Sequence, residues 1–593
     1  MYFGELFRSF RPLHNPLGFG AADFVLLAFA LSVTACVMLR VALLPYASKI
    51  AARTGFAMVI VAGVAILLRL ALLNSSPVPT PSGADDFSYL LLADTLGHLR
   101  LANQTHPLHQ FFEAVFVLQQ PAYSSIFPLG QGLALALGHL VFGSFWAGVL
   151  LPTALFCALC YWMLRGWISA PWAFAGGMLA VIQFGPLNAW TNTYWGGAVS
   201  ACAGCLVFGA LPRWRYAPDQ NQCHNALLLG LGMGLQLLTR PFEFVLLAIC
   251  VVLFWIAPSL KRARSPIMAK NFAVVCLALL PAVGLTLLQN KRVTGDWTTL
   301  PYQLSRYQYG VPATFTWQPN PAPHRALTAE QELDYRAQAA IHGPGTDSIA
   351  SYFVRLAFRL RYLRFFLLAP LYFAVAFSLG NFKQPQWRGV FATIAIFIAG
   401  MNFYPYFFPH YAAAITCLFV LIAVKGLENL AQIEWRGFQA GALAARLLLL
   451  LCFTHFFFWY GLHFSGNPNL LPATAQETWD FINYGDPQGR MAVDEQLTRS
   501  PGGQLVFVRY SPQHRFEEWI GNAVDIDSSK IVWALDLGPA ENRRLLSYFP
   551  FRASWLLEPD ARPPRLIPYS EAANSFESVP IQSAPAVAGA PSK

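Results

Sequence analysis

The chain has 593 residues, of which 55% are hydrophobic and only 12% are charged, and its mean hydropathy is +0.43. This composition excludes an ordinary soluble domain and indicates a membrane protein. The net charge is +10, and the excess of basic over acidic residues lies in the first 464 residues, which hold 29 basic and 15 acidic residues. The remainder holds 11 basic and 15 acidic residues. The positive charge therefore belongs to the membrane part, and nothing in the sequence indicates nucleic-acid binding.

Apolar runs long enough to cross a hydrocarbon core of about 30 Å recur between residues 22 and 464. Helices are predicted, because a helix satisfies its own backbone hydrogen bonds in lipid. The fold class is an all-α polytopic membrane protein with about 11–13 transmembrane helices, followed by a small α/β domain. The predicted spans are residues 22–46, 54–74, 145–165, 171–188, 195–212, 224–239, 241–258, 269–290, 363–380, 388–405, 410–430 and 439–464.

Basic residues cluster in short connections between these spans, and such connections face the cytoplasm. Three segments then lie on the extracytoplasmic side: residues 75–144, residues 291–362 and everything after residue 464. The orientation of the N-terminus stays open, since basic residues occur both before and after the first run. The clusters are Arg213/Arg215, Lys261/Arg262/Arg264, Lys383/Arg388 and Lys425/Arg436.

The first outer segment contains "GADDFSYLLLADTLGHLR", residues 83–100. Asp85 and Asp86 are an adjacent acidic pair in acid-poor surroundings, followed by an apolar face of Tyr89, Leu92, Leu96 and Leu99. This pattern predicts a helix along the membrane surface. The carboxylates either cap that helix and complement its dipole or form a catalytic base or metal-binding pair. Residues 130–143 are apolar but too short to span comfortably, so they predict a juxtamembrane or re-entrant helix.

Other polar residues fall at the outer ends of predicted spans. Tyr194 and Trp195 belong to the outer turn "NAWTNTYWGG", and Arg240 and Glu243 belong to "LTRPFEF". An ionisable side chain at such a depth indicates function. Arg240 either pairs with Glu243 to brace the break at Pro241 or holds an anion such as a lipid phosphate.

The second outer loop, 291–362, is long and rich in aromatic residues, which favours a functional role over disorder. Lys291, Arg292 and Arg306 in it either add to the phosphate site or snorkel to the interface. His410 and Tyr411, at the start of a span, have either a binding role or an aromatic-belt role. His106, His109 and Glu113 have spacings compatible with metal ligation, although a fourth ligand is missing.

Residues 465–573 predict a soluble extracytoplasmic α/β domain, with strands at 504–510, 530–537 and 553–559 and a helix at 539–549. The tail 574–593, rich in Ala, Pro and Ser, is predicted to be disordered.

The acidic pair Asp85–Asp86 with Tyr89, the proline-led "FPLGQGLALALG", "YWGG" and "TRPFE" together resemble the GT-C superfamily of membrane glycosyltransferases. The likeness is greatest to the bacterial relatives of protein O-mannosyltransferases and aminoarabinose transferases, and it covers roughly residues 50–464. Many relatives carry another acidic residue in the second short outer loop, which "NAWTNTYWGG" lacks. A divalent metal ion is therefore an open question as a cofactor.

The resemblance implies that residues 1–464 form a GT-C-like catalytic domain in the plasma (inner) membrane. It implies inverting transfer of a sugar from a polyprenyl phosphate donor to a hydroxyl of a glycan, lipid or protein acceptor on the extracytoplasmic face. Asp85 would be the base and Asp86 its neighbour, with the donor phosphate on Arg240, Lys291, Arg292 and Arg306. The expected substrate-binding residues are Tyr89, Glu113, Tyr194, Trp195, Glu243, Tyr302, His410 and Tyr411.

Two alternatives remain open. A transporter or flippase of a lipid-linked sugar would use the same spans, although it should show polar or broken helices near the midplane and related halves. An O-antigen-type ligase or polymerase would depend on Arg306 and His410 more than on Asp85.

Overall fold

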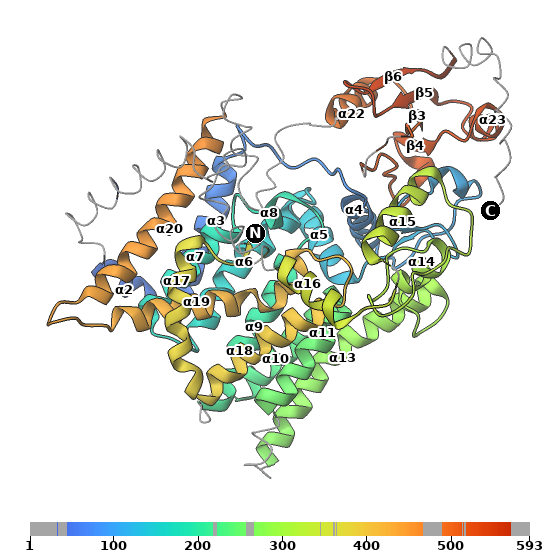
Figure 1. Ribbon diagram of the computed structural model, residues 1–593. Coiled ribbons are helices and arrows are strands. Elements are labelled where there is room, and N and C mark those ends of the chain that lie inside the picture. Colours follow the sequence, from blue (N-terminus) through green and yellow to red (C-terminus); the bar gives the residue numbers. More distant parts are fainter. Residues whose placement is uncertain are drawn as a thin grey trace, which may run out of the picture.

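The computed structural model describes residues 44–216, 222–256, 266–343, 345–359, 365–466, 489–512 and 517–570, together with residues 33, 362 and 514. Helices dominate the described part up to residue 466, and a small sheet follows (Figure 1). The predicted fold class, an α-helical membrane protein with a small α/β region at the C-terminal end, is confirmed. The predicted span at 22–46 falls almost entirely outside the described residues, and the predicted tail at 574–593 lies wholly outside them.

Within the described residues, five helices are long and apolar enough to cross a membrane: 54–71, 147–164, 269–294, 409–431 and 440–465. Shorter apolar helices pack against them, and their shared core is continuous. The helices of this part are α2 (Leu44–Ala52), α3 (Thr54–Ala71), α6 (Ala147–Leu164), α7 (Ala170–Phe184), α8 (Ala189–Asn192), α9 (Ala198–Tyr216), α10 (Gln222–Thr239), α11 (Pro241–Cys250), η3 (Val251–Ile256), α13 (Pro266–Thr294), α17 (Ala369–Ser378), η5 (Leu379–Lys383), α18 (Pro385–Met401), η6 (Pro409–Ile415), α19 (Thr416–Ala431) and α20 (Ala440–Ser465).

The first segment predicted to lie outside the membrane forms α4 (Ala84–Gly97), η2 (His109–Phe112), a two-stranded ladder of β1 (Val117–Leu118) and β2 (Ser124–Ser125), and α5 (Leu129–Phe142). The second forms α14 (Pro301–Tyr309), α15 (Ala329–His342) and α16 (Ile349–Arg359). No helix was predicted for residues 329–342. The signal for α15 is a capping box, in which Thr328 and Gln331 satisfy each other's backbone N–H groups.

The C-terminal region builds a four-stranded sheet in the order β4-β3-β5-β6, with α22 (Arg490–Arg499), η7 (Ile526–Ser528) and α23 (Pro539–Tyr548) around it. The strands β3 (Gln504–Val508), β4 (Ile531–Leu535) and β5 (Ala553–Glu558) are parallel, and β6 (Arg565–Pro568) is antiparallel to β5. All five residues of β3 are buried, as expected for the central strand of a covered sheet. The three predicted strands and the predicted helix are confirmed.

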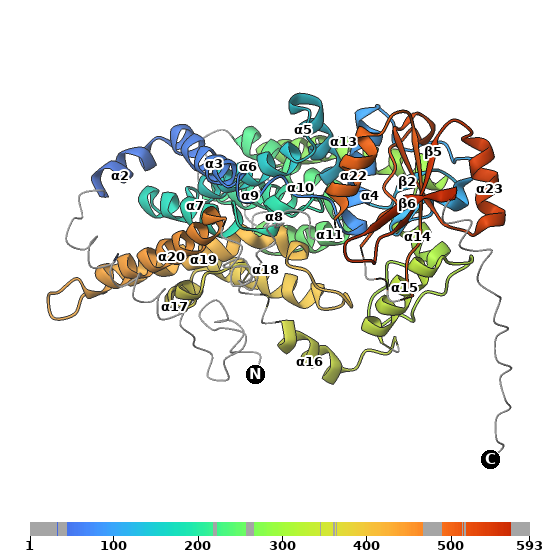
Figure 2. The ribbon, with the colours of Figure 1, turned by 90° about the horizontal axis from the view of Figure 1, so that it is seen from above.

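The helix α4 is packed between two parts of the molecule, and its position along the membrane surface stays a prediction. Tyr89 and Leu92 pack toward the membrane helices, while Leu91 packs into the core that includes the C-terminal sheet. Figures 1 and 2 show α4 between these two parts. Leu99 lies beyond the end of the helix and is 96% exposed. Tyr89, Leu92 and Leu96 of the predicted apolar face therefore share one packed side, and Leu91 gives α4 a second covered side.

Candidate functional site

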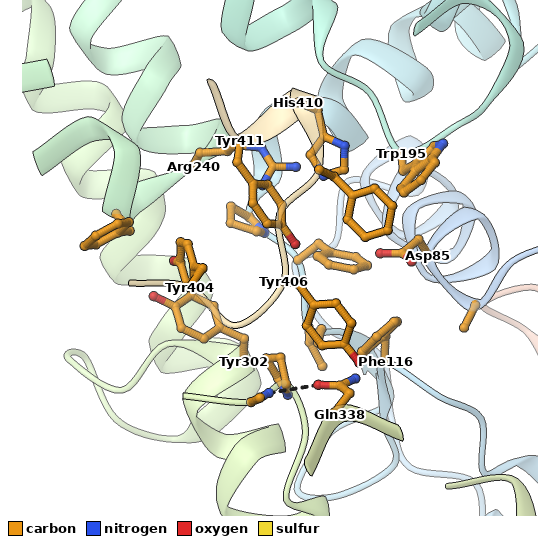
Figure 3. Close-up of a pocket in the computed structure, with 18 of the residues that line it drawn as sticks. Asp85, Phe116, Trp195, Arg240, Tyr302, Gln338, Tyr404, Tyr406, His410 and Tyr411 are labelled. Carbon is orange, nitrogen blue, oxygen red and sulfur yellow. Dashed lines mark hydrogen bonds between the residues drawn. The ribbon is translucent and has the colours of Figure 1, made fainter. Parts of the chain in front are cut away.

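A cavity of about 470 Å³ lies where the two outer segments meet the ends of the membrane helices. Its walls are largely aromatic, and its charged residues come from separate segments of the chain. Figure 3 shows Asp85 reaching in from one wall, with Arg240 and Tyr411 on the opposite side. The charged lining residues are Asp85, Arg240, Glu243, Arg306 and Asp334.

Asp85 lies in the first turn of α4, where a carboxylate is favoured by the helix dipole. Its side chain is half-buried because it faces the cavity. Burial, followed by the negative charges of Asp86 and Asp334, raises the pKa of Asp85 to about 7, against the opposing effect of Arg240. One turn later, Tyr89 also lines the cavity and stacks on Phe127 at a centroid distance of 4.2 Å. Asp85 is therefore a cavity-facing carboxyl group whose pKa is raised by its surroundings.

Asp86 has a different environment, although it is the next residue. It is 7% exposed, and its two oxygens accept hydrogen bonds from the backbone N–H groups of Tyr194 (2.9 Å) and Ser82 (3.2 Å). Burial raises the pKa of Asp86 to about 6, opposed by these bonds and by one from the Gly83 N–H. Asp86 therefore joins the start of α4 to the turn at Tyr194.

The turn after Tyr194 depends on glycine. Gly196 has φ +78°, and a Cβ atom there would lie 2.4 Å from Oε1 of Gln131. The same Gln131 donates from Nε2 to the carbonyl of Tyr194 at 3.0 Å, while the Tyr194 hydroxyl donates to the carbonyl of Pro79 at 2.9 Å. Tyr194 is thus a supporting residue outside the cavity lining, whereas its neighbour Trp195 lines the cavity.

Replacing Asp86 by asparagine is expected to destabilise the protein rather than to remove its activity. An amide keeps one acceptor oxygen, so one of the two N–H groups loses its partner, at a cost of about 1–3 kcal/mol. Thermal unfolding in detergent should show a lower melting temperature, and activity per folded molecule should fall by less than about tenfold. An unchanged melting temperature with lost activity would instead identify Asp86 as the reacting group.

Arg240 lies at the break between α10 and α11. Pro241 occupies the first turn of α11, so the chain is extended at Arg240 (φ −149°, ψ 91°). Nη1 of Arg240 lies 3.6 Å from Oε1 of Glu243, and the guanidinium lies over the ring of Tyr411 at 4.8 Å. The geometry is compatible both with a structural pair between Arg240 and Glu243 and with an anion site, because the guanidinium that pairs with Glu243 also lines the cavity.

Of the other predicted phosphate-binding residues, Arg306 lines the cavity and Lys291 and Arg292 do not. Arg306 donates from Nε to the carbonyl of Pro312 at 3.1 Å and lies over the ring of Tyr302, which also lines the cavity. Lys291 is exposed and donates from Nζ to the carbonyl of Gly295 at 2.7 Å, and Arg292 is exposed too. Both belong to the last turn of α13, where basic residues complement the helix dipole.

His410 and Tyr411 line the cavity from η6. The imidazole of His410 stacks on Phe408 at 5.6 Å and meets Trp195 edge-on at 5.1 Å. His410 is buried and sits within an aromatic cluster at the cavity wall. The predicted binding residues Tyr89, Trp195, Glu243, Tyr302, His410 and Tyr411 are therefore brought together here.

Sequence reasoning missed the acidic residue that α15 contributes. Asp334 is 6% exposed and accepts a hydrogen bond from Nε2 of Gln338 at 2.9 Å, while Oε1 of Gln338 accepts from the N–H of Ala313 at 2.9 Å. Burial raises the pKa of Asp334 to about 6. The sequence did contain a signal for this helix: a capping box at its start, followed by Asp334 and Gln338 four residues apart and so on one helix face. Tyr404 and Tyr406, between α18 and η6, were also missed.

Glu113, His106 and His109 lie outside the cavity lining and do not form a ligand set. Glu113 is paired with Arg325 at 2.6 Å and accepts hydrogen bonds from the Tyr309 hydroxyl and the Gln331 amide. Nε2 of His106 lies 3.0 Å from Asp527. Among the residues that the structure describes, no three His, Cys, Asp or Glu side chains are grouped as metal ligands. His106, His109 and Glu113 are therefore held by other partners and are not gathered as the metal site that their spacing suggested, and no reaction step is assigned to a metal ion.

No protein-family model matches the chain, and no curated protein matches it. Solved structures do show a similar chain path. ArnT from Cupriavidus metallidurans in its apo state matches at 11% identity over 88% of this chain and 95% of that one, with a TM-score of 0.47. The same protein with undecaprenyl phosphate bound matches at 12% identity over 77% of this chain and 83% of that one, with a TM-score of 0.44. Oligosaccharyltransferase AglB from Archaeoglobus fulgidus, in complex with an inhibitory peptide and a dolichol-phosphate, matches at 14% identity over 76% of this chain and 58% of that one, with a TM-score of 0.39.

Both matched proteins are GT-C glycosyltransferases, the superfamily that the sequence resembles. The likeness concerns the path of the chain, at low identity and with TM-scores below 0.5. The function proposed next rests on the chemistry of the cavity.

Proposed function

We propose that this protein is a membrane glycosyltransferase that moves a sugar from a polyprenyl phosphate donor to an acceptor hydroxyl on the extracytoplasmic face. The observation that carries the proposal is a cavity at the ends of the membrane helices in which Asp85 faces Arg240 (Figure 3). A carboxylate and a guanidinium across one space match the two needs of the reaction, a base for the hydroxyl and a cation for the phosphate.

In the proposed reaction the acceptor oxygen bonds to the anomeric carbon while the bond from that carbon to the phosphate oxygen breaks. Asp85 takes the proton of the acceptor hydroxyl, and the polyprenyl phosphate leaves with the electron pair of the broken bond. A single displacement of this kind inverts the configuration at the anomeric carbon. Arg240, with Arg306 on the same cavity, stabilises the negative charge that grows on the phosphate.

The aromatic walls suit the remaining parts of the substrates. Tyr302, Tyr404 and Phe408 give apolar surface to a sugar ring and to the first prenyl units, and the cavity volume of about 470 Å³ is in the range of small-molecule sites. The rest of a polyprenyl chain needs apolar surroundings, which the lipid-facing membrane helices offer. The basic connections at Arg213 and Lys425 support an extracytoplasmic orientation of the cavity.

The charged groups that line this cavity come from one end of the membrane helices, and their arrangement does not favour a transport path over transfer. A flippase would have to move its cargo between the two faces, whereas Asp85 adjoins an outer loop. We therefore keep transfer as the proposed function, and the assay below separates the two.

The reaction should depend on pH through Asp85. The pKa of this carboxyl is raised to about 7, so the basic form is a minority below that pH. For the wild type, kcat/KM should rise about tenfold per pH unit on the acid side and level off above about pH 7. In Asp85→Asn this rise on the acid side, the acid limb of the profile, should be absent. Initial rates between about pH 5 and 9 test this. An acid limb that survives in Asp85→Asn would assign the base elsewhere.

The direct test is turnover by the purified full-length protein of a panel of radiolabelled polyprenyl phosphate sugars. Acceptor-dependent release of polyprenyl phosphate is the expected result. Binding of the whole panel without release, together with movement of the labelled lipid between leaflets of a reconstituted vesicle, would overturn the proposal in favour of a flippase.

A further inference from the structure

One wall of the cavity holds a buried carboxyl group whose capacity to accept hydrogen bonds is only partly used. Asp334 lines the cavity from α15 and is 6% exposed. Its Oδ2 accepts a hydrogen bond from Nε2 of Gln338 at 2.9 Å. In the part of the chain that the structure describes, no cation pairs with Asp334 and no group donates to its Oδ1. Because the oxygens of so buried a carboxyl group are normally hydrogen-bonded, Oδ1 indicates a donor that a ligand brings.

Gln338 supplies a donor beside this acceptor. Its Oε1 accepts from the N–H of Ala313 at 2.9 Å, which fixes the orientation of the amide and directs Nε2 toward Asp334. Of the two N–H bonds on Nε2, one is used by Asp334, and none of the described residues accepts from the other. Gln338 also lines the cavity. An acceptor oxygen and a donor N–H side by side match hydroxyl groups, each of which can both donate and accept.

The pair lies away from the expected phosphate site. Figure 3 shows Gln338 well separated from Arg240, with the rings of Tyr406 and Phe116 close to it. A polyprenyl phosphate sugar with its phosphate at Arg240 would have its prenyl chain among the apolar membrane helices. The sugar is then the part of the donor that can extend toward Asp334 and Gln338. A few fixed polar groups in an otherwise aromatic wall are typical of sites that select a small ligand.

Phe116 contributes to the same wall in a backbone conformation that a bulky residue rarely adopts, with φ +62°. Its carbonyl accepts from the Ser88 hydroxyl at 2.7 Å and from the N–H of Ile126 at 3.2 Å, so the surrounding structure holds this conformation. Residues held under strain in this way are concentrated at ligand sites. The ring of Phe116 offers an apolar surface to one side of a sugar whose hydroxyl groups bond to Asp334 and Gln338.

We propose that Asp334 and Gln338 bind two neighbouring hydroxyl groups of the donor sugar and thereby select that sugar. Oδ1 of Asp334 accepts from one hydroxyl, and the second N–H of Gln338 donates to the oxygen of the other. The inference rests on the proposed function, since it takes a lipid-linked sugar as the ligand of the cavity. It adds two binding residues that recognise the donor and take no part in breaking or forming bonds. An analogue that lacks one of these hydroxyls is disfavoured, because a buried polar group then stays unpaired.

Equilibrium binding to the purified full-length protein in detergent, without acceptor, tests the proposal. The probes are labelled polyprenyl phosphate sugars and polyprenyl phosphate without a sugar. Asp334→Leu should weaken binding of the tightest sugar lipid by about 10–100-fold and binding of the bare lipid by less than about twofold. Asp334→Asn should weaken binding of the sugar lipid by about 3–10-fold, because an amide bonds to a hydroxyl without a charge. This second variant also keeps an oxygen for Gln338.

Deoxy analogues of the sugar lipid identify the contact itself. The analogue without the hydroxyl bound by Asp334 should bind the wild type about as weakly as the parent lipid binds Asp334→Leu. Its affinity should change by less than about twofold in that variant, because the group that Asp334 recognises is already missing. If every analogue lost as much affinity in Asp334→Leu as the parent lipid does, Asp334 would not contact a sugar hydroxyl.

Glu332→Gln is the matched control, since Glu332 lies on the same helix and pairs with Arg336 at the surface. It should bind both lipids as the wild type does. Asp334→Asn should melt no lower than the wild type, because it removes a buried carboxyl group that has no cation. A lower melting temperature with equal weakening of both lipids would give Asp334 a structural role and overturn the proposal.

Two further results would also overturn it: unchanged affinity of Asp334→Leu for every sugar lipid, or unchanged donor binding with a raised KM for the acceptor. The predicted binding pattern in a protein that releases no polyprenyl phosphate would overturn the proposed function alone. Sugar transfer by a protein whose Asp334 variants bind the donor as the wild type does would overturn this inference alone.

Discussion

Replacing Asp85 by asparagine is expected to slow sugar transfer strongly while leaving the protein at least as stable as the wild type. The substitution removes the basic oxygen that takes the acceptor proton, an effect of about 10²–10⁴-fold in kcat for a general base. The donor phosphate should still bind, because Arg240 and Arg306 are untouched and a negative neighbour has been removed. Release of polyprenyl phosphate, measured beside equilibrium binding of a labelled donor, checks both parts.

The stability of Asp85→Asn distinguishes a lost base from a damaged fold. Because burial raises the pKa of Asp85 to about 7, the protonated carboxyl favours folding, and this contribution declines as the pH rises from the unfolded value of about 3.9 toward 7. At about pH 8 the wild type carries the unfavourable charge and the asparagine variant does not. The variant should therefore melt at the same or a higher temperature there. A lower melting temperature, with activity lost in proportion, would return Asp85 to helix capping.

Removing the charge of Arg240 is expected to lower kcat/KM by about 10²–10³-fold, the size of effect seen when one stabilising donor to a developing anion is lost. The single variant Arg240→Met would also leave Glu243, 3% exposed, as an unpaired buried charge and so destabilise the break between α10 and α11. The informative variant is therefore Arg240→Met combined with Glu243→Gln. Arg240→Lys should be intermediate, because it keeps the charge and loses the two-pronged contact with phosphate.

Lys291→Met serves as the matched control for Arg240. It removes a positive charge from the same outer surface, but Lys291 is exposed and binds the carbonyl of Gly295 outside the cavity. Donor affinity and kcat/KM should stay within about twofold of the wild type, since surface charges contribute little. Equal losses in Lys291→Met and in the Arg240 double variant would show that the outer surface attracts the donor only through its overall charge.

Features that depend on a local sequence pattern were predicted well from the sequence. The membrane helices follow from apolar runs, and β3, β4 and β5 follow from short blocks of β-branched and aromatic residues between turns. The break at Pro241 follows from the missing N–H of proline. Position at the predicted outer ends of the spans was enough to select Arg240, Trp195 and His410, all of which line one cavity.

The same reasoning failed where contacts between distant segments decide the outcome. Asp85 and Asp86 share one local context, and the sequence does not show that the Tyr194 turn packs against α4 and donates to Asp86, whereas Asp85 faces the cavity. Lys291 and Arg292 looked equivalent to Arg306 in the sequence, but α13 directs them outward.

By itself, the sequence determined that this is a helical membrane protein with polar residues at one set of helix ends and an α/β domain after them. Hydropathy and backbone hydrogen bonding act over a few residues, so they can be read locally. The tertiary structure alone decided which carboxylate faces the cavity, that Asp334 joins it from α15, and that α4 lies between the membrane helices and the C-terminal domain. These features depend on side chains hundreds of residues apart, whose burial and pairing no local pattern encodes.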